Sequence, residues 1–245
     1  MKKVLNQITL SAEAGTKSFA LLIDPDKTRG KLLIETTQLA NDSGISYIFV
    51  GGSLINGNDF NECISVLKSE CNLPIIIFPG NEMQISPEAD AILFLSMISG
   101  RNPDLLIGKH VHAAPVIKEF GLEAIPTGYM LIDGGRITSA QYMSNTIPIP
   151  ADKPDIAACT ALAGEMLGLQ LIYMDAGSGA ENPVSAEMIE AVKRNTSLPI
   201  IVGGGISSAK QAQHSFAAGA DIIVVGNAVE KNPKLIYEVT AMAAV

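Results

Sequence analysis

Eight short apolar segments recur along the chain, and longer stretches with apolar residues at helical spacing separate them. Each apolar segment is rich in β-branched residues and has few polar interruptions, which is typical of strands buried on both faces. The eight segments are 18–24, 46–52, 74–80, 91–97, 123–132, 170–179, 199–205 and 221–227. Strand-like and helix-like patterns that alternate in this way predict parallel β/α units.

Seven of the intervening or following stretches have the pattern of helices. Ser185 and Ser208 stand at the start of two of them, where a side-chain oxygen can cap the first turn. The seven stretches are 28–43, 59–70, 103–120, 154–167, 185–195, 208–218 and 232–244. A doubly wound sheet would give the same alternation, but eight units in 245 residues favour closure. We predict a single (β/α)8 TIM barrel over residues 1–245.

Three segments depart from this repeat. Near the N-terminus, Val4, Leu5 and Ile8 recur at helical spacing before Gly15, which predicts an additional N-terminal helix. The link 81–90 is short for a helix, so the helix after the third strand is expected to be reduced or irregular. The stretch 133–150 is polar, contains two prolines and is expected to be a structureless loop, and loops of this length usually have a functional or interfacial role.

Composition and charge limit the class of protein. With 47% hydrophobic and 17% charged residues, the chain has the composition of a folded domain. Its net charge of −8 argues against nucleic acid as a partner, although a small anionic substrate remains compatible with it. The three scattered cysteines form neither a disulfide framework nor a metal-binding spacing, which indicates a reducing cytoplasm. No transmembrane segment is expected, because no run of about 18 apolar residues occurs.

Glycines stand at the ends of three consecutive predicted strands, at 177, 179, 203–205 and 226. In barrels of this type, the loops after the last strands commonly bind phosphate through backbone N–H groups, which glycine leaves accessible. Helices that start directly after these turns would add free N–H groups. The alternative is that the glycines only make tight turns. Three glycine-rich strand ends in a row favour phosphate.

Oxygen ligands follow the first two strands. Asp24 and Ser53 provide a carboxylate and a hydroxyl at adjacent strand ends, which suits Mg²⁺ together with phosphate oxygens. Asp24 could equally belong to an ordinary Asp-Pro-Asp turn, and this alternative stays open. Lys27 on the same turn could bind an anionic substrate or be solvated.

Two other types of site are disfavoured. His110 and His112 are two residues apart on a predicted helix, so their side chains diverge and make a poor metal pair. No lysine lies within any of the eight apolar segments. A Schiff-base aldolase is therefore disfavoured, because it needs a lysine desolvated inside the barrel.

The motifs in order are DPDK at 24–27, GGS at 51–53, YMDAGSGA at 173–180, GGGI at 203–206 and GN at 226–227. Together with SGRNP at 99–103, they resemble geranylgeranylglyceryl phosphate synthases over essentially the whole chain, and most closely the second group of that family. The related bacterial heptaprenylglyceryl phosphate synthases differ at the first strand, where they have Lys and this chain has Leu22. The family often has Glu where this chain has Asp175.

The resemblance implies transfer of a prenyl chain from a prenyl diphosphate to the 3-hydroxyl of sn-glycerol 1-phosphate, with release of diphosphate. It places Mg²⁺ at Asp24 and Ser53, and gives Asp175 and Asp24 catalytic roles. Asp175 would orient the glycerol hydroxyl and could also deprotonate it. The residues implied to hold glycerol phosphate are Tyr173, Met174, Asp175, Ala176, Gly177, Ser178, Gly179, Gly204, Gly205, Gly226 and Asn227.

The resemblance also implies a homo-oligomer, either a dimer or a hexamer. Tyr142 in the polar stretch is a candidate contact, because aromatic side chains anchor interfaces. The prenyl tail needs an apolar groove, for which the helices after the third to fifth strands and the turn 99–106 are the expected walls.

Two other functions compete with this one. Another phosphate-binding barrel, an isomerase or lyase of a sugar phosphate or indole-glycerol phosphate, would use Asp24 and Asp175 as an acid/base pair without Mg²⁺. A barrel that binds a phosphometabolite without chemistry is the second alternative, and oxygen ligands at both the first and sixth strands argue against it.

Overall fold

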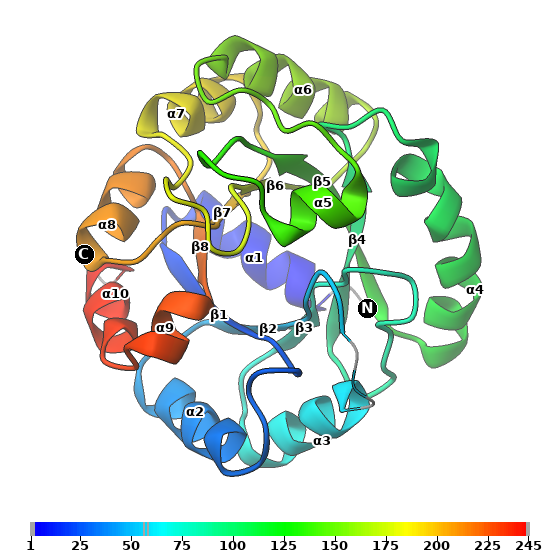
Figure 1. Ribbon diagram of the computed structural model, residues 1–245, viewed down its shortest axis with the longest axis vertical. Coiled ribbons are helices and arrows are strands. Elements are labelled where there is room, and N and C mark those ends of the chain that lie inside the picture. Colours follow the sequence, from blue (N-terminus) through cyan, green and yellow to red (C-terminus); the bar gives the residue numbers. More distant parts are fainter. Residues whose placement is uncertain (1–2, 56, 58, 244–245) are drawn as a thin grey trace.

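The computed structural model describes residues 3–55, 57 and 59–243. Eight parallel strands pair in chain order, and β1 also pairs with β8, which closes the barrel and confirms the predicted fold (Figure 1). The strands are β1 Ser18–Ile23, β2 Tyr47–Val50, β3 Ile75–Ile77, β4 Ala91–Met97, β5 Glu123–Leu131, β6 Leu171–Asp175, β7 Ile200–Gly203 and β8 Ile222–Val225.

Both faces of the sheet are buried, which is why the strands read as nearly continuous apolar runs. In β2, Tyr47 and Phe49 belong to the cluster that fills the barrel, whereas Ile48 and Val50 belong to the cluster between the strands and the helices. All four side chains have no exposed surface. Side chains alternate in this way because successive residues of a strand point to opposite faces.

Helices surround the barrel and flank its two ends (Figure 1). They are α1 Lys3–Glu13, α2 Gly30–Asp42, α3 Phe60–Glu70, the π-helix η1 Asp104–Gly108, α4 Lys109–Phe120, α5 Ser139–Ser144, α6 Pro154–Met166, α7 Ala186–Asn195, α8 Ala209–Ala217, α9 Asn227–Lys231 and α10 Leu235–Ala243. None of these helices, over the residues that are described, is long and apolar enough to cross a membrane.

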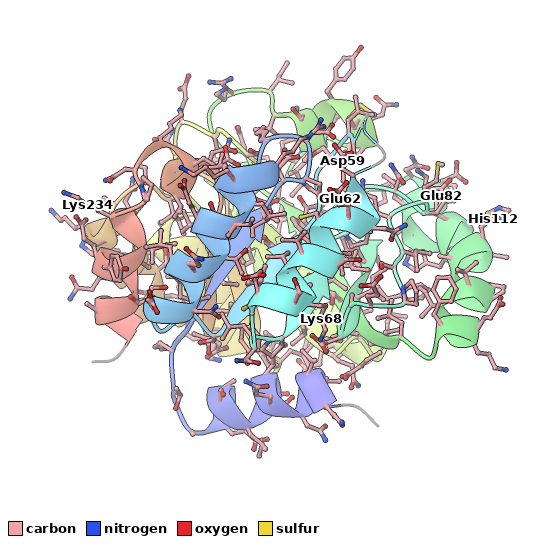
Figure 2. All side chains as sticks on the ribbon, turned by 90° about the horizontal axis from the view of Figure 1, so that it is seen from below. Asp59, Glu62, Lys68, Glu82, His112 and Lys234 are labelled. Carbon is pink, nitrogen blue, oxygen red and sulfur yellow. The ribbon has the colours of Figure 1, made fainter. Side chains whose placement is uncertain are left out.

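The predicted N-terminal helix is present as α1, which covers the N-terminal end of the barrel (Figure 2). Val4, Leu5 and Ile8 are buried and pack with the residues that fill the barrel. Each such side chain stabilises the fold by about 1.5–3 kcal/mol. The N–H groups of Val4 and Leu5, which an α-helix leaves unpaired at its start, donate to the carboxylate of Glu123 on β5 at 3.0 and 2.9 Å.

A reduced or irregular helix was predicted between β3 and β4, and the structure departs further from the repeat than that. All residues of this connection, 78–90, are described, and they form turns, bends and irregular backbone without a helix. The outer face of the barrel therefore lacks one covering helix between α3 and α4. The connection that replaces this helix lines one side of the site.

Three predicted segments differ from the structure. The stretch 133–150 contains α5, because Thr138 Oγ1 caps it by accepting from the N–H of Gln141, and it ends where Asn145 adopts a φ of 49°. The helix expected over 103–120 begins as the π-helix η1 before it continues as α4. The helix expected over 232–244 is α10, preceded by the short α9, and residue 244 lies outside the described residues.

Candidate active site

A cavity of about 670 Å³ lies at the C-terminal ends of the strands. This volume is within the usual range for a small-molecule site. The cavity brings together most of the residues predicted from the sequence: Asp24, Ser53, Tyr173, Asp175, Ser178, Gly179, Gly204, Gly205, Gly226 and Asn227 all line it. The residues predicted to bind Mg²⁺ and those predicted to bind phosphate therefore line the same cavity.

Met174 and Ala176 were also predicted to hold glycerol phosphate, but neither of them lines the cavity. Both are buried in the cluster between strands and helices. The reason is the two-residue period of β6, which turns Tyr173 and Asp175 toward the barrel axis and Met174 away from it. Gly177 is buried, and its N–H donates to Asp175 Oδ1 at 2.7 Å. This N–H group therefore holds the carboxylate of Asp175 in place.

Asp175 is the buried carboxylate of the cavity. It is only 6% exposed, and its Oδ2 accepts a hydrogen bond from the hydroxyl of Tyr129 at 2.6 Å. Burial raises the pKa of Asp175, while the hydrogen bonds from Tyr129 and from the Gly177 N–H oppose the rise. Each carboxylate oxygen retains a second lone pair for a substrate hydroxyl.

Tyr129 is a site residue that the sequence reasoning missed. It lies near the C-terminal end of β5, where the register pairs it with Tyr173, and its ring packs edge-on against that residue at 5.5 Å. Phe78 stacks on Tyr173 at 4.9 Å, so aromatic rings form a dry floor under Asp175. The available signal was a tyrosine near the end of an otherwise apolar strand next to the strand of Asp175.

The glycines after β7 allow a close approach of three loops. Gly204 and Gly205 have φ angles of 78° and 71°, which side chains rarely adopt. A Cβ on Gly204 would lie 2.7 Å from Asp175 Oδ1, so close packing against the carboxylate also requires glycine at this position. Within the described residues, no acceptor pairs with the N–H groups of Gly204, Gly205, Ser178 and Gly179. Four free donors around one corner of the cavity fit an anion.

Asp24 and Ser53 form the second polar corner. Gly52, which precedes Ser53, lies against Asp24, since a Cβ built on it would be in ordinary contact with Asp24 Oδ1 at 3.4 Å. Asp24 Oδ1 accepts from the Asp26 N–H at 3.1 Å, as the turn interpretation requires, yet the carboxylate also lines the cavity. The turn and the site are therefore compatible.

The side chains at this corner offer Mg²⁺ a small number of oxygen ligands. Among the described residues, no group of three or more His, Cys, Asp or Glu side chains could hold a metal ion. One carboxylate and one hydroxyl leave most of an octahedral shell to water and phosphate oxygens, which is how Mg²⁺ is commonly bound beside phosphorylated substrates. The residues fit a metal ion that binds together with a diphosphate.

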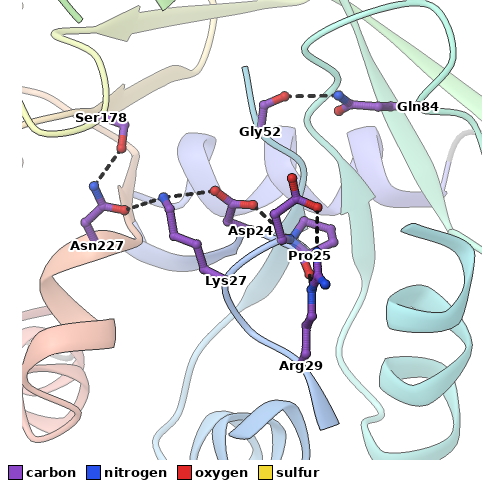
Figure 3. A network of polar contacts seen from close by, with 9 residues as sticks. Asp24, Pro25, Lys27, Arg29, Gly52, Gln84, Ser178 and Asn227 are labelled. Carbon is purple, nitrogen blue, oxygen red and sulfur yellow. Dashed lines mark hydrogen bonds and ion pairs between the residues drawn. The ribbon is translucent and has the colours of Figure 1, made fainter. Parts of the chain in front are cut away.

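Lys27 connects the two polar corners (Figure 3). Its Nζ lies 2.9 Å from Asp24 Oδ2 and donates to Asn227 Oδ1 at 3.3 Å, and Asn227 Nδ2 donates to Ser178 Oγ at 2.7 Å. Burial favours the neutral amine, but the hydrogen bond and charge of Asp24, with weaker contributions from Glu230 and Asp26, raise the pKa of Lys27. The ammonium is therefore charged at neutral pH.

Gln84 is a second residue that the sequence did not reveal. Its side chain is buried and donates to the carbonyl of Gly52 at 3.0 Å (Figure 3). It also accepts from the N–H of Gly80 at 3.0 Å. It ties the helix-free connection to the end of β2, beside Ser53. Glutamine has no distinctive spacing, so no sequence signal marked it.

An apolar flank extends the cavity outward between β4 and α4. Its walls include Ile92, Phe94, Ala113 and Ile117, and Ile85 contributes from the helix-free connection. Of the expected walls, the turn 99–106 contributes Asp104 and Leu105, whereas no residue of α6 lines the cavity within the described chain. The gap left by the missing helix opens this flank.

His110 and His112 diverge as predicted. His112 is exposed, whereas His110 lines the apolar flank with its ring edge-on to Phe94 at 4.5 Å. Burial lowers the pKa of His110, so its imidazole adds no charge to the apolar flank at neutral pH.

Comparison with known proteins places this site in a family. The family model described as "PcrB family" matches residues 13–244, which is nearly the whole chain. The chain belongs to the PcrB family. This PcrB-family chain is 52% identical over 236 residues to a geranylgeranylglyceryl phosphate synthase of Chitinophaga pinensis, covering 96% of this chain and 94% of that protein. It is also 52% identical over 229 residues to one of Spirosoma linguale, covering 94% and 92%.

Solved structures of similar proteins support the same family. The crystal structure of (S)-3-O-geranylgeranylglyceryl phosphate synthase from Thermoplasma acidophilum, in complex with its substrate sn-glycerol 1-phosphate, is 32% identical to this PcrB-family chain. It superposes with a TM-score of 0.93 and covers 99% of each chain. The resemblance inferred from the motifs is thereby confirmed.

Proposed function

We propose that this chain is a geranylgeranylglyceryl phosphate synthase, which transfers a prenyl chain from a prenyl diphosphate to the 3-hydroxyl of sn-glycerol 1-phosphate. The observation that carries the proposal is a single cavity with three parts: a corner of free N–H groups, a corner with Asp24 and Ser53, and an apolar flank. A relative solved with sn-glycerol 1-phosphate supports the acceptor. The apolar flank supports a donor with a long hydrocarbon tail.

The reaction needs a base or an orienting group at the acceptor. The bond between the allylic carbon and the diphosphate oxygen breaks, and its electron pair leaves with the diphosphate. The 3-hydroxyl oxygen of the acceptor forms the ether bond to the same carbon as its proton departs. We assign Asp175 to this hydroxyl, and the assignment is supported by its carboxylate lining the cavity together with the residues of the four free N–H groups. Its raised pKa improves its match to a proton acceptor near neutral pH.

The donor half needs to stabilise the departing diphosphate. Asp24 and Ser53 would hold Mg²⁺, which neutralises the charge that develops on diphosphate when the C–O bond ionises. Lys27 adds a positive charge at the same corner. The aromatic floor and the apolar flank exclude water from the allylic carbon.

The direct test is an assay with labelled sn-glycerol 1-phosphate and prenyl diphosphates of several lengths, each with and without Mg²⁺. A prenyl ether product that requires Mg²⁺ is the expected result. Absence of a prenyl ether at every chain length would contradict the proposed activity. A turnover of sugar phosphate or indole-glycerol phosphate without Mg²⁺ would favour the rival isomerase or lyase.

A Tyr129→Phe variant should move the acidic limb of the pH–activity profile. The hydrogen bond from Tyr129 lowers the pKa of Asp175, so its removal raises that pKa further. Because the ionised carboxylate accepts the proton, activity rises with pH through this pKa, and the limb should shift to higher pH. The measurement is kcat/KM against pH. Asp175→Asn should lack this limb, and an unshifted limb in Tyr129→Phe would assign it to another group.

An Ala113→Phe variant should shorten the preferred donor. Ala113 is buried on α4 and lines the apolar flank, so a phenyl ring there would occupy the space of a long tail. We expect kcat/KM for a geranylgeranyl donor to fall on the order of 10-fold or more, with little change for a geranyl donor. Ala114→Phe is the matched control, because Ala114 is the next residue of the same helix and its side chain is exposed. An equal loss of kcat/KM with the geranyl and geranylgeranyl donors would contradict binding of the tail in the apolar flank.

A homo-oligomer is part of the proposal. Tyr142 and Ile147 in the segment around α5 are 79% and 86% exposed, and large apolar side chains that are this exposed commonly mark interfaces. Analytical ultracentrifugation tests it, and a particle with the mass of one chain would contradict it.

A cytoplasmic enzyme is also proposed, supported by three cysteines that are all free.

A further inference from the structure

The chain of contacts through Lys27 joins loops that follow three different strands. Asp24 and Lys27 follow β1, Asn227 follows β8, and Ser178 follows β6 (Figure 3). The contacts run without a gap from the carboxylate of the donor corner to the loop of the acceptor corner, at 2.9, 3.3 and 2.7 Å. A ligand that binds one of these polar groups therefore changes the hydrogen-bond partners that remain for the neighbouring group in the chain of contacts.

The proposed reaction brings two anions into this cavity. A diphosphate at Asp24 and a phosphate beside Ser178 repel each other, and the repulsion is stronger in a partly buried site than in water. Lys27 is placed to offset it. Two further lysines line the cavity, but Lys109 pairs with Glu82 at 3.1 Å. For Lys231, the described residues include no contact with Asp24, Asn227 or Ser178.

Lys27 is also free to change partner. Its side chain is 49% exposed, and a lysine ammonium on its four-carbon stem can redirect its donors by rotation. Mg²⁺ at Asp24 would repel an ammonium that now lies 2.9 Å from the same carboxylate. Diphosphate oxygens are then the nearest alternative partner, while Asn227 remains beside the ammonium on the acceptor side.

We propose that Lys27 is a further catalytic residue that binds the diphosphate of the donor and, through Asn227, couples donor binding to acceptor binding. This inference rests on the proposed function. In the ternary complex, the ammonium lies between the two anionic groups and offsets their repulsion. Each substrate then binds at least as tightly in the presence of the other as alone.

Isothermal titration calorimetry tests the coupling without turnover. The probes are sn-glycerol 1-phosphate and geranylgeranyl thiolodiphosphate with Mg²⁺, in which a sulfur replaces the bridging oxygen and the chain is transferred poorly. In the natural enzyme, the acceptor should bind the analogue-loaded protein at least as tightly as the free protein. In Lys27→Met, it should bind the loaded protein on the order of 10-fold more weakly than the free one, and reversing the order of addition must give the same factor.

Two control variants define the outcome. Lys27→Arg keeps the charge and should keep most of the coupling, whereas Lys231→Met removes a charge from the same rim and should leave the coupling near its natural value. An equal loss of coupling in Lys231→Met, or an unchanged factor in Lys27→Met, overturns the role of Lys27. If neither probe binds the natural enzyme, the proposed function fails as well, so the two failures are distinguishable.

Discussion

Replacing Asp175 with Ala is expected to lower kcat/KM by about 10²-fold or more, the usual contribution of a positioned general base. Asp175 is the buried carboxylate of the acceptor corner, and its pKa is raised by burial. The substitution removes the group that orients the 3-hydroxyl and accepts its proton. Steady-state kinetics with both substrates varied measures the loss. Kinetics like those of the natural enzyme would remove Asp175 from the mechanism.

Asp175→Asn provides the control for folding. In the Ala variant, the Tyr129 hydroxyl and the Gly177 N–H lose their acceptor, which costs about 1–3 kcal/mol of stability for each group left unpaired. An amide at the same position can accept from Gly177 and donate to the Tyr129 oxygen. The Asn variant should therefore melt near the natural temperature while losing activity to a similar extent. Activity retained in Asn and lost in Ala would indicate that Asp175 acts only through packing.

Asp24→Ala is expected to remove the response to Mg²⁺ and to lower activity by at least about 10²-fold. Substitution of residues that only orient metal ligands already costs 10–100-fold, and Asp24 is the proposed ligand itself. The Ala variant also leaves Lys27 without its partner at 2.9 Å. Initial rates across a Mg²⁺ titration measure both effects.

Asp59→Asn is the matched control for Asp24. It removes one negative charge from the rim of the same face, where the carboxylate of Asp59 pairs with Arg29 at 3.0 Å (Figure 2). This variant should keep its Mg²⁺ response. An Asp24→Ala enzyme with an unchanged Mg²⁺ titration would exclude Asp24 from the metal site. Mg²⁺-independent activity that needs both Asp24 and Asp175 would instead favour the acid/base pair of an isomerase or lyase.

Much of the fold could be predicted because the physics of a closed parallel barrel is local and repetitive. Strands such as Tyr47–Val50 are buried on both faces, so an apolar run is enough to identify them. The helix α1 followed from its apolar spacing, and the short link before β4 predicted a reduced helix, whereas the structure has no helix there. The short α5 was missed because a helix of fewer than two turns has too few residues to show an apolar period, and its one capping residue, Thr138, stands in a polar stretch that reads as a loop.

The candidate site was predicted less completely. Asp24 and Asp175 stand at strand ends, and those ends meet at one face of a barrel, so their proximity followed from topology. Met174 was assigned by motif and turned out to face the helices, because a motif names positions without stating which face each side chain takes. Tyr129 and Gln84 carry no distinctive spacing, and their roles depend on contacts across 46 and 32 residues.

The sequence by itself determined the eight strands, the glycine-rich strand ends, the two carboxylates and the family, since each depends on residue type and spacing along the chain. Tertiary structure alone decided that Tyr129 donates to Asp175, that the missing helix opens an apolar flank, and that Lys27 bridges the two corners. These features depend on which strands and loops become neighbours in space. Pairing of β5 with β6 brings Tyr129 to Asp175, and closure of the barrel between β1 and β8 brings Lys27 to Asn227 across 200 residues.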